Sequence, residues 1–202
     1  IIVYTSDQGF YMGEHGWFDK RFMYEESLRT PLLIAYPGHI QPGTVCNKLV
    51  QNIDYAPTFL DLAGISKPKE LPGRSLTPIF KAGDKVKGWR SSIYYHYYDY
   101  PTYHMVRKHD GVRTDRYKLI HFYGAGGLDA VKENKYQRQP GTREHGCMTY
   151  LNSLGYFEPK DSAVNYNELY DLQADPHELN NLYGKPGYEK ITKQLQKQLT
   201  DY

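Results

Sequence analysis

Two side chains with oxygen donors lie at the end of the first apolar run of the sequence. Asp7 and Gln8 follow the run of residues 1–5, and open α/β sheets place their ligands at the carboxyl ends of strands. Carboxylate and amide oxygens suit a hard cation such as calcium, which takes about six to eight oxygen ligands. The same residues could instead form an Asx turn where the chain leaves the strand. Both interpretations stay open at this point.

A histidine and a lysine follow shortly after this pair. His15 lies between Gly13 and Gly16, and glycine allows the backbone to approach a ligand closely. Lys20 follows an aromatic segment and could bind an anion. The alternatives are a structural or solvated histidine and a lysine in a surface ion pair.

Residues 94–109 are rich in tyrosine and histidine and could contact a substrate. The chain has 21 tyrosines against 7 phenylalanines. The polar hydroxyl of a tyrosine ring suits partly solvated surfaces and sugar-binding clefts. His104, Arg107 and His109 could donate hydrogen bonds to carboxylate or sulfate oxygens. The alternative is a partly buried strand followed by a surface loop, because tyrosine favours strands.

The elements that would position these side chains form two blocks. We expect residues 1–87 to be an α/β domain with strands over 1–5 and 31–36. Continuous apolar runs of this kind are typical of parallel strands that are buried on both faces. Asp54 as N-cap and Gly64 in the C′ position predict a short amphipathic helix between them.

Residues 88–202 form the second block, for which we expect a small antiparallel sheet with a helix. Alternation and turn residues predict a strand, a hairpin, another strand and an amphipathic terminal helix, over residues 90–98, 111–123, 168–172 and 189–202. Residues 124–166 show little periodicity, which predicts a long loop.

Composition excludes several classes of protein. The length of 202 residues allows one to two domains. The net charge of +2 implies no strongly basic surface for nucleic acid. No apolar run approaches the roughly 20 residues of a membrane span. The two cysteines, Cys46 and Cys147, allow at most one disulfide and exclude a four-cysteine zinc site.

The sequence begins inside an apolar strand, without an initiator methionine or a signal peptide. A buried strand needs neighbouring strands and covering helices. We therefore expect the chain to be the carboxy-terminal part of a longer polypeptide, with the missing amino-terminal part as its partner. The absent signal peptide then says nothing about export.

Several short motifs follow one another along the chain. They are Ser6-Asp7-Gln8-Gly9, Gly13-Glu14-His15-Gly16, Arg29-Thr30-Pro31-Leu32, Gly73-Arg74-Ser75-Leu76 and Glu168-Leu169-Tyr170-Asp171-Leu172. In this order, and over nearly the whole chain, they resemble the type I, formylglycine-dependent sulfatases of the alkaline phosphatase superfamily. Residues 113–120 are also similar to bacterial sulfatases of polysaccharides and glycosaminoglycans.

This resemblance implies a fold, a reaction and a set of site residues. The expected fold class is α/β, the tail of an alkaline-phosphatase-like α/β sandwich followed by a small antiparallel sheet with a C-terminal helix. The expected function is removal of sulfate from a sulfated carbohydrate by an exported hydrolase of the periplasm, cell surface or lysosome. By resemblance, Asp7 and Gln8 bind Ca²⁺, Lys20 contacts the sulfate, and His15 lies by the sulfate or the adjoining sugar.

The resemblance fits the charge changes of the reaction. Hydrolysis of a sulfate ester moves negative charge onto the sulfuryl oxygens and the leaving oxygen. A divalent cation and a fixed ammonium group offset that charge, and an imidazole can protonate the leaving oxygen. The C-terminal subdomain of such enzymes lends residues to the sugar pocket, which suits His104, Arg107 and His109.

The nucleophile of the family is missing from this chain. Formylglycine is made from Cys or Ser in a Cys/Ser-x-Pro/Ala-x-Arg context, and neither Cys46 nor Cys147 lies in one. We therefore predict that this chain alone neither binds calcium tightly nor hydrolyses sulfate esters. Two alternatives remain, a related phosphate or phosphonate ester hydrolase and a non-catalytic carbohydrate-binding module. The hard oxygens favour calcium over the transition metals of the former, and the buried first strand argues against the latter.

Overall fold

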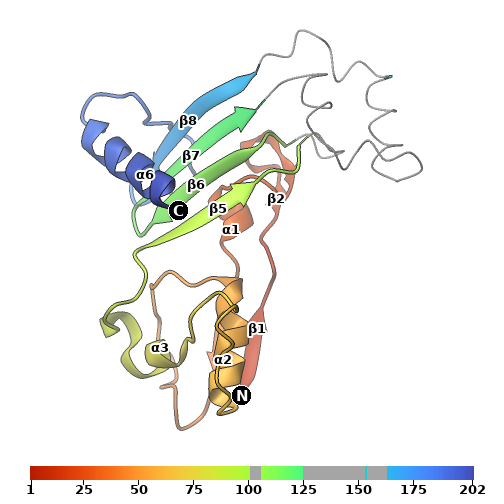
Figure 1. Cartoon of the computed structure of the whole chain (residues 1–202), viewed down its shortest axis with the longest axis vertical. Coiled ribbons are helices and arrows are strands. Elements are labelled where there is room, and N and C mark those ends of the chain that lie inside the picture. Colours follow the sequence, from red (N-terminus) through yellow and green to blue (C-terminus); the bar gives the residue numbers. More distant parts are fainter. Residues whose placement is uncertain (101–105, 125–152, 154–162) are drawn as a thin grey trace.

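The computed structural model describes residues 1–100, 106–124, 153 and 163–202. The first half contains these elements (Figure 1): β1 (Ile2–Thr5), β2 (Tyr11–Met12), η1 (Glu14–Gly16), β3 (Phe18–Asp19), α1 (Glu25–Leu28), β4 (Leu32–Ala35), η2 (Asn52–Asp54), α2 (Tyr55–Leu62), α3 (Thr77–Ala82) and η3 (Gly83–Lys85). The second half contains β5 (Ser92–Tyr97), β6 (His109–Thr114), β7 (Tyr117–Gly124), β8 (Val164–Asp171) and α6 (Glu189–Asp201).

The first strand pairs with β4, and the pairing is antiparallel. One face of this sheet lies against α2, where the Thr5 and Tyr55 hydroxyls are 2.8 Å apart. The other face is open, because Ile2, Tyr4 and Leu33 are 73%, 66% and 60% exposed. The predicted parallel pairing is therefore not found for β1 in the described residues, and its burial on both faces stays a prediction for a longer polypeptide. An apolar run indicates that a strand is to be covered, but not which neighbour it pairs with or in which direction.

The predicted helix after Asp54 is confirmed as α2, and Asp54 occupies its N-cap position. No side-chain hydrogen bond from Asp54 caps α2, because the chain enters it through η2. The Asp54 carboxylate instead accepts the Gln51 amide at 2.8 Å. At the other end Gly64 has a φ of +68°, and the Ile65 amide donates to the Leu60 carbonyl at 2.9 Å. Gly64 thus ends the helix as predicted.

The second half forms a four-stranded antiparallel sheet in the order β5-β6-β7-β8. The expected hairpin is confirmed, with Asp115 and Arg116 between β6 and β7. The terminal helix is confirmed as α6. The strand predicted at 168–172 is also present, but β8 begins four residues earlier, at Val164. Most of the predicted loop at 124–166 lies outside the described residues.

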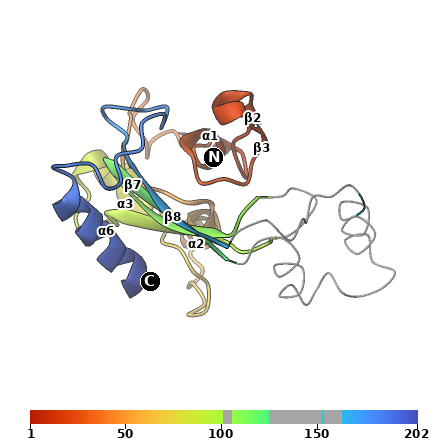
Figure 2. The same cartoon turned by 90° about the horizontal axis from the view of Figure 1, so that it is seen from above.

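Both faces of the four-stranded sheet are covered, α6 lying on one and α1 with the β2–β3 hairpin on the other (Figure 2). Alternation along the strands separates the two cores. The core on the α6 side consists of Val112, Leu119, Leu169, Leu182 and, from α6 itself, Leu195. The opposite core consists of Tyr11, Phe22, Met23, Tyr24, Val106, Ile120, Phe122 and Tyr170.

The second of these cores joins the two sequence blocks. The segment between β2 and α1, which includes Lys20, follows the first strand in sequence but packs on the sheet of the second block. At Gly111 of β6 an added Cβ would lie 2.4 Å from the Met23 sulfur, so only glycine permits this contact. The division into domains 1–87 and 88–202 stays a prediction, and the packing shows that a core crosses it.

Among the described residues, no helix is both long enough and apolar enough to span a membrane.

Candidate functional site

Asp7 and Gln8 leave the end of β1, as the sequence predicts. The Asp7 side chain is 82% exposed. Its Oδ1 accepts the Gln8 backbone amide at 2.9 Å, and the Ser6 hydroxyl donates to the Gln8 carbonyl at 2.8 Å. These bonds make a local turn, so part of the alternative interpretation is present. The second carboxylate oxygen, Oδ2, is not used by the turn and faces Lys20.

Lys20 lies beside the carboxylate of Asp7. Its Nζ is 3.8 Å from Asp7 Oδ2, and its side chain is 35% exposed. An ion pair this exposed contributes about 0–1 kcal/mol to stability. The attraction between the two charges is too weak to bring them together, so the backbone must do so. The structure therefore brings together Asp7, Gln8 and Lys20, as predicted, and their roles stay predictions.

An open cleft of about 1120 Å³ lies beside this strand end. Asp7 and Gln8 line it together with Arg29 and Arg113, and its apolar walls come from β4, α3 and β5. The cleft is thus accessible from the strand end and carries cationic side chains.

The donors present here fit calcium in kind but not in number. Asp7 and Gln8 offer hard oxygens, whereas calcium takes about six to eight oxygen ligands. In the parts of the chain that are described, no group of three or more His, Cys, Asp or Glu residues is arranged to bind a metal ion. The residues fit one part of a calcium site and would need further ligands from elsewhere.

His15 lies in a constrained position against α1. Its φ is +55°, its ring stacks on Tyr24 at a centroid distance of 4.3 Å, and its Nε2 is 3.3 Å from Glu26 Oε2. The side chain is 11% exposed. None of these contacts involves Asp7 or Lys20, so the structure does not join His15 to these two residues, which we call the strand-end pair. Its role toward a sulfate or sugar stays a prediction.

His109 is buried, which does not fit the predicted contact with a substrate. It is 0% exposed and stacks on Phe22, Tyr95 and Tyr97. Its Nδ1 lies 2.8 Å from the Arg107 carbonyl. Burial lowers its pKa to about 4. The prediction is corrected, because the alternation of β6 directs this side chain into the core.

The other two predicted substrate residues are placed differently. The Arg107 guanidinium lies 4.7 Å from the centroid of the Tyr100 ring, and its role toward a substrate stays a prediction. His104 lies outside the described residues. The possible disulfide also stays open, since Cys147 lies outside them as well.

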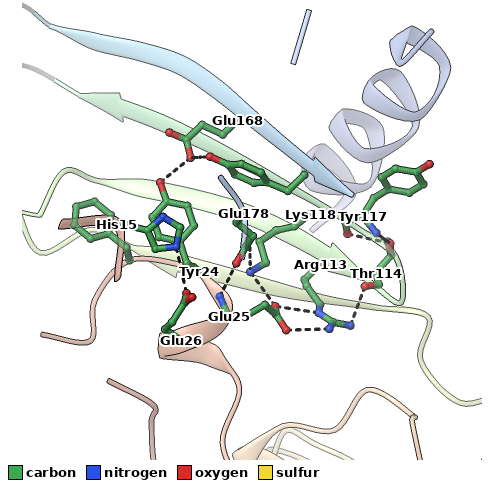
Figure 3. Close-up of polar contacts among 12 residues, drawn as sticks. His15, Tyr24, Glu25, Glu26, Arg113, Thr114, Tyr117, Lys118, Glu168 and Glu178 are labelled. Carbon is green, nitrogen blue, oxygen red and sulfur yellow. Dashed lines mark hydrogen bonds and ion pairs between the residues drawn. The ribbon is translucent and has the colours of Figure 1, made fainter. Parts of the chain in front are cut away.

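Sequence reasoning missed a buried charge network beside α1 (Figure 3). Lys118 Nζ is 2.9 Å from Glu25 Oε1 and 2.7 Å from Glu178 Oε1. Arg113 Nη2 is 3.1 Å from Glu25 Oε2. One signal was available in the sequence, because Lys118 shares a strand face with Ile120 and a charge on an apolar face needs partners. The partners themselves are distant in sequence.

The network perturbs its two carboxyl groups in opposite directions. Burial alone would raise the pKa of Glu25, but Lys118 and Arg113 lower it to about 2. Burial raises the pKa of Glu178 in spite of the adjacent Lys118. Glu25 is therefore the firmly ionised member and the main counterion of the two cations.

Comparison with known proteins adds a family and several relatives. Residues 13–139 and 155–202 match the family described as N-sulphoglucosamine sulphohydrolase, C-terminal. An N-acetylglucosamine-6-O-sulfatase of Bacteroides thetaiotaomicron is 42% identical over all of this chain, which spans 29% of that protein. The N-acetylglucosamine-6-sulfatase of Bos taurus is 34% identical over 90% of this chain, and the match covers 30% of that protein.

A solved structure is similar over nearly the whole chain. It is a protein in complex with its substrate D-glucosamine-2-N,6-O-disulfate, with a TM-score of 0.76 and 42% identity. The match covers 99% of this chain and 33% of that one. The predicted fold class, the tail of an α/β sandwich followed by an antiparallel sheet and a terminal helix, is thereby confirmed.

Proposed function

This chain belongs to the N-sulphoglucosamine sulphohydrolase C-terminal family of the sulfatases, and from that premise we propose that it is part of an enzyme that hydrolyses sulfate esters of a carbohydrate. In this proposal Asp7 and Gln8 bind one side of a calcium ion, and Lys20 binds the sulfate. The relatives that match over the chain are sulfatases by name, which favours a sulfate ester over a phosphate or phosphonate ester.

The observation that carries the proposal is the distance of 3.8 Å between Lys20 Nζ and Asp7 Oδ2 at the end of β1. An anionic group that contacts Lys20 would also lie beside a cation bound to Asp7. The exposure of both side chains leaves them accessible to such a group.

The residues of this chain would act on charge and orientation. Lys20 would donate a hydrogen bond to a sulfuryl oxygen and offset the negative charge that grows there in the transition state. Asp7 and Gln8 would hold a calcium ion, which would supply further positive charge to the site. An imidazole beside the sulfate would protonate the leaving oxygen, and His15 is the candidate that the family resemblance gives, with its Nε2 against Glu26.

We propose that the rest of the protein supplies what this chain lacks. The chain spans about 30% of the length of the relatives named above. An amino-terminal part would contribute the nucleophile and further calcium ligands and would cover the open face of the β1–β4 sheet at Ile2, Tyr4 and Leu33. We also propose that the complete protein is exported.

The substrate class we propose is a sulfated amino sugar. The relative that is 42% identical over the whole chain is an N-acetylglucosamine-6-O-sulfatase, and the similar solved structure contains a disulfated glucosamine as its substrate. Arg107 and His104 stay candidates for contacts with the sugar.

The test uses the complete protein with glucosamine 6-O-sulfate and measures release of sulfate. Lys20→Ala is expected to lower kcat by about 10²–10³-fold, the usual loss for one donor to a developing oxyanion. Lys190→Ala on the exposed side of α6 is the control and is expected to leave kcat unchanged. The 202-residue chain alone, with calcium added, is expected to release no sulfate. Full activity of the Lys20→Ala variant would contradict the role of Lys20.

A further inference from the structure

The short helix α1 contacts both the end of β1 and the segment that carries Lys20. The Ser27 carbonyl accepts the Gly9 amide at 2.8 Å, and the Ser27 hydroxyl donates to the Lys20 carbonyl at 2.7 Å. Gly9 lies so close to the helix that an added Cβ would be 1.9 Å from the Glu26 carbonyl oxygen. A single residue of α1, itself 1% exposed, is thus bonded to both segments that carry the strand-end pair.

The position of Ser27 is fixed by the sheet beneath it. An isolated helix of four residues is far too short to be stable, so α1 depends on tertiary contacts. Glu25, at its start, is bound by Lys118 of β7 and by Arg113 of β6. The Glu25 amide donates to Glu178 Oε2 at 2.7 Å. Figure 3 shows that these contacts reach α1 from the two strands and from the turn after β8.

Opposite charges face one another in the network that holds α1 on the sheet. Glu25 opposes both Lys118 and Arg113, and Glu178, whose pKa is raised by burial, lies 2.7 Å from Lys118 Nζ. Removing one member of a buried pair leaves an uncompensated charge, which costs far more than an exposed pair gains. The network therefore stabilises one location of α1 against the sheet.

We propose that Ser27 is a positioning residue that sets Lys20 against Asp7, and that the network of Glu25, Lys118 and Glu178 fixes Ser27 on the sheet. This inference rests on the proposed function of Lys20 and adds the residues that hold Lys20 in position. The Lys20–Asp7 contact is too exposed to maintain its own geometry, whereas Ser27, which is bonded to Lys20 and Gly9, is itself buried. Loss of the Ser27 hydroxyl would leave the lysine present but free to move from the sulfate.

A double-mutant cycle in the complete protein tests the inference. Ser27→Ala is expected to lower kcat/KM for the sulfated sugar by about 3- to 10-fold, the range for loss of one hydrogen bond. On a Lys20→Ala background the same change is expected to have less than about a 2-fold effect. An equal loss on both backgrounds would overturn the inference, because Ser27 would then not act through Lys20.

Two further variants control for folding. Thr192→Ala removes a comparable hydroxyl, which donates to the Tyr188 carbonyl at 2.8 Å in α6, and is expected to leave kcat/KM unchanged. Ser27→Cys keeps the volume of the side chain with a weaker donor. Its kcat/KM is expected to lie between those of the parent and Ser27→Ala, whereas a value at or below that of Ser27→Ala would indicate a packing role and overturn the inference.

Hydrogen exchange separates this inference from the proposed function. In the complete protein Ser27→Ala is expected to raise amide exchange over residues 9–21 and to leave α6 as in the parent. No rise over residues 9–21 would overturn the positioning role whatever the activity. If the exchange rises but Lys20→Ala keeps full activity, the proposed function fails, and with it the part of the inference that concerns sulfate.

Discussion

Asp54 is a buried carboxylate whose hydrogen bonds are all made inside the protein. It is 0% exposed and binds both terminal nitrogens of the Arg90 guanidinium. The backbone amides of Gln51 and Arg74 also donate to it, each at 2.8 Å. One side chain thus joins η2, the loop before α3 and the segment before β5.

We expect Asp54→Ala to lower the free energy of unfolding by about 3–5 kcal/mol, because it leaves Arg90 unpaired in a buried place. Urea denaturation of the complete protein measures this. Asp61, an exposed carboxylate that accepts the Ser75 hydroxyl, is the matched control, and Asp61→Ala is expected to cost about 1 kcal/mol. Equal losses for the two variants would contradict the importance of burial.

We expect His109 to make the protein sensitive to acid. Its pKa is lowered by burial from the ordinary 6.5 to about 4, so between these values the unfolded chain binds a proton that the folded protein excludes. Stability is therefore expected to fall as the pH drops from about 6.5 to about 4.

We expect His109→Phe, which retains the aromatic packing, to reduce the loss of melting temperature between pH 7 and pH 5. Thermal unfolding of the complete protein at the two pH values measures the difference. His177 is exposed, and His177→Phe is expected to keep the acid sensitivity of the parent. If His109→Phe also keeps it, another group is responsible.

At the scale of elements, α6 covers one face of the four-stranded sheet through a narrow apolar stripe. Leu195 is fully buried against Val112, Leu119 and Leu169, whereas Lys193 on the same helix is exposed. The attachment of the helix depends on this stripe, because the charged residues of the helix face solvent.

We expect Leu195→Ala to destabilise the protein by about 2–5 kcal/mol, the usual cost of a cavity at a leucine site. Chemical denaturation measures the change, and Lys193→Ala should alter stability by less than about 0.5 kcal/mol. A loss below about 1 kcal/mol for Leu195→Ala would show that the helix is not held by this contact.

At the scale of the whole molecule, the two sheets differ in how they are covered. The four-stranded sheet has a core on each face, whereas Ile2, Tyr4 and Leu33 leave one face of the β1–β4 sheet exposed. Exposed apolar patches of neighbouring residues promote association.

We expect the 202-residue chain alone to self-associate as its concentration rises, and Tyr4→Lys combined with Leu33→Lys to weaken that association. Sedimentation velocity measures both. In the complete protein, where we propose that this face is covered, the same two changes are expected to destabilise the fold instead. A chain that stays monomeric at all concentrations would contradict the first expectation.

Local patterns in the sequence determined much of this structure. Alternation around Asp115 and Arg116 specified the β6–β7 hairpin, and Gly64 ended α2, because turn geometry and periodicity act over a few residues. Asp7, Gln8 and Lys20 could be chosen from their types and order, since they lie close together in the sequence. The same motifs, by resemblance, indicated the sulfatase family.

Only the tertiary structure decided which side chains meet across the chain. Glu25 and Glu178 are 153 positions apart, and no local pattern shows that they share Lys118. From the sequence, His109 could donate hydrogen bonds at the surface. The pairing of β6 directs its side chain into the core instead. The sequence could indicate which residues are able to do chemistry, but sheet pairing and burial determine which of them face a ligand and which stabilise the core.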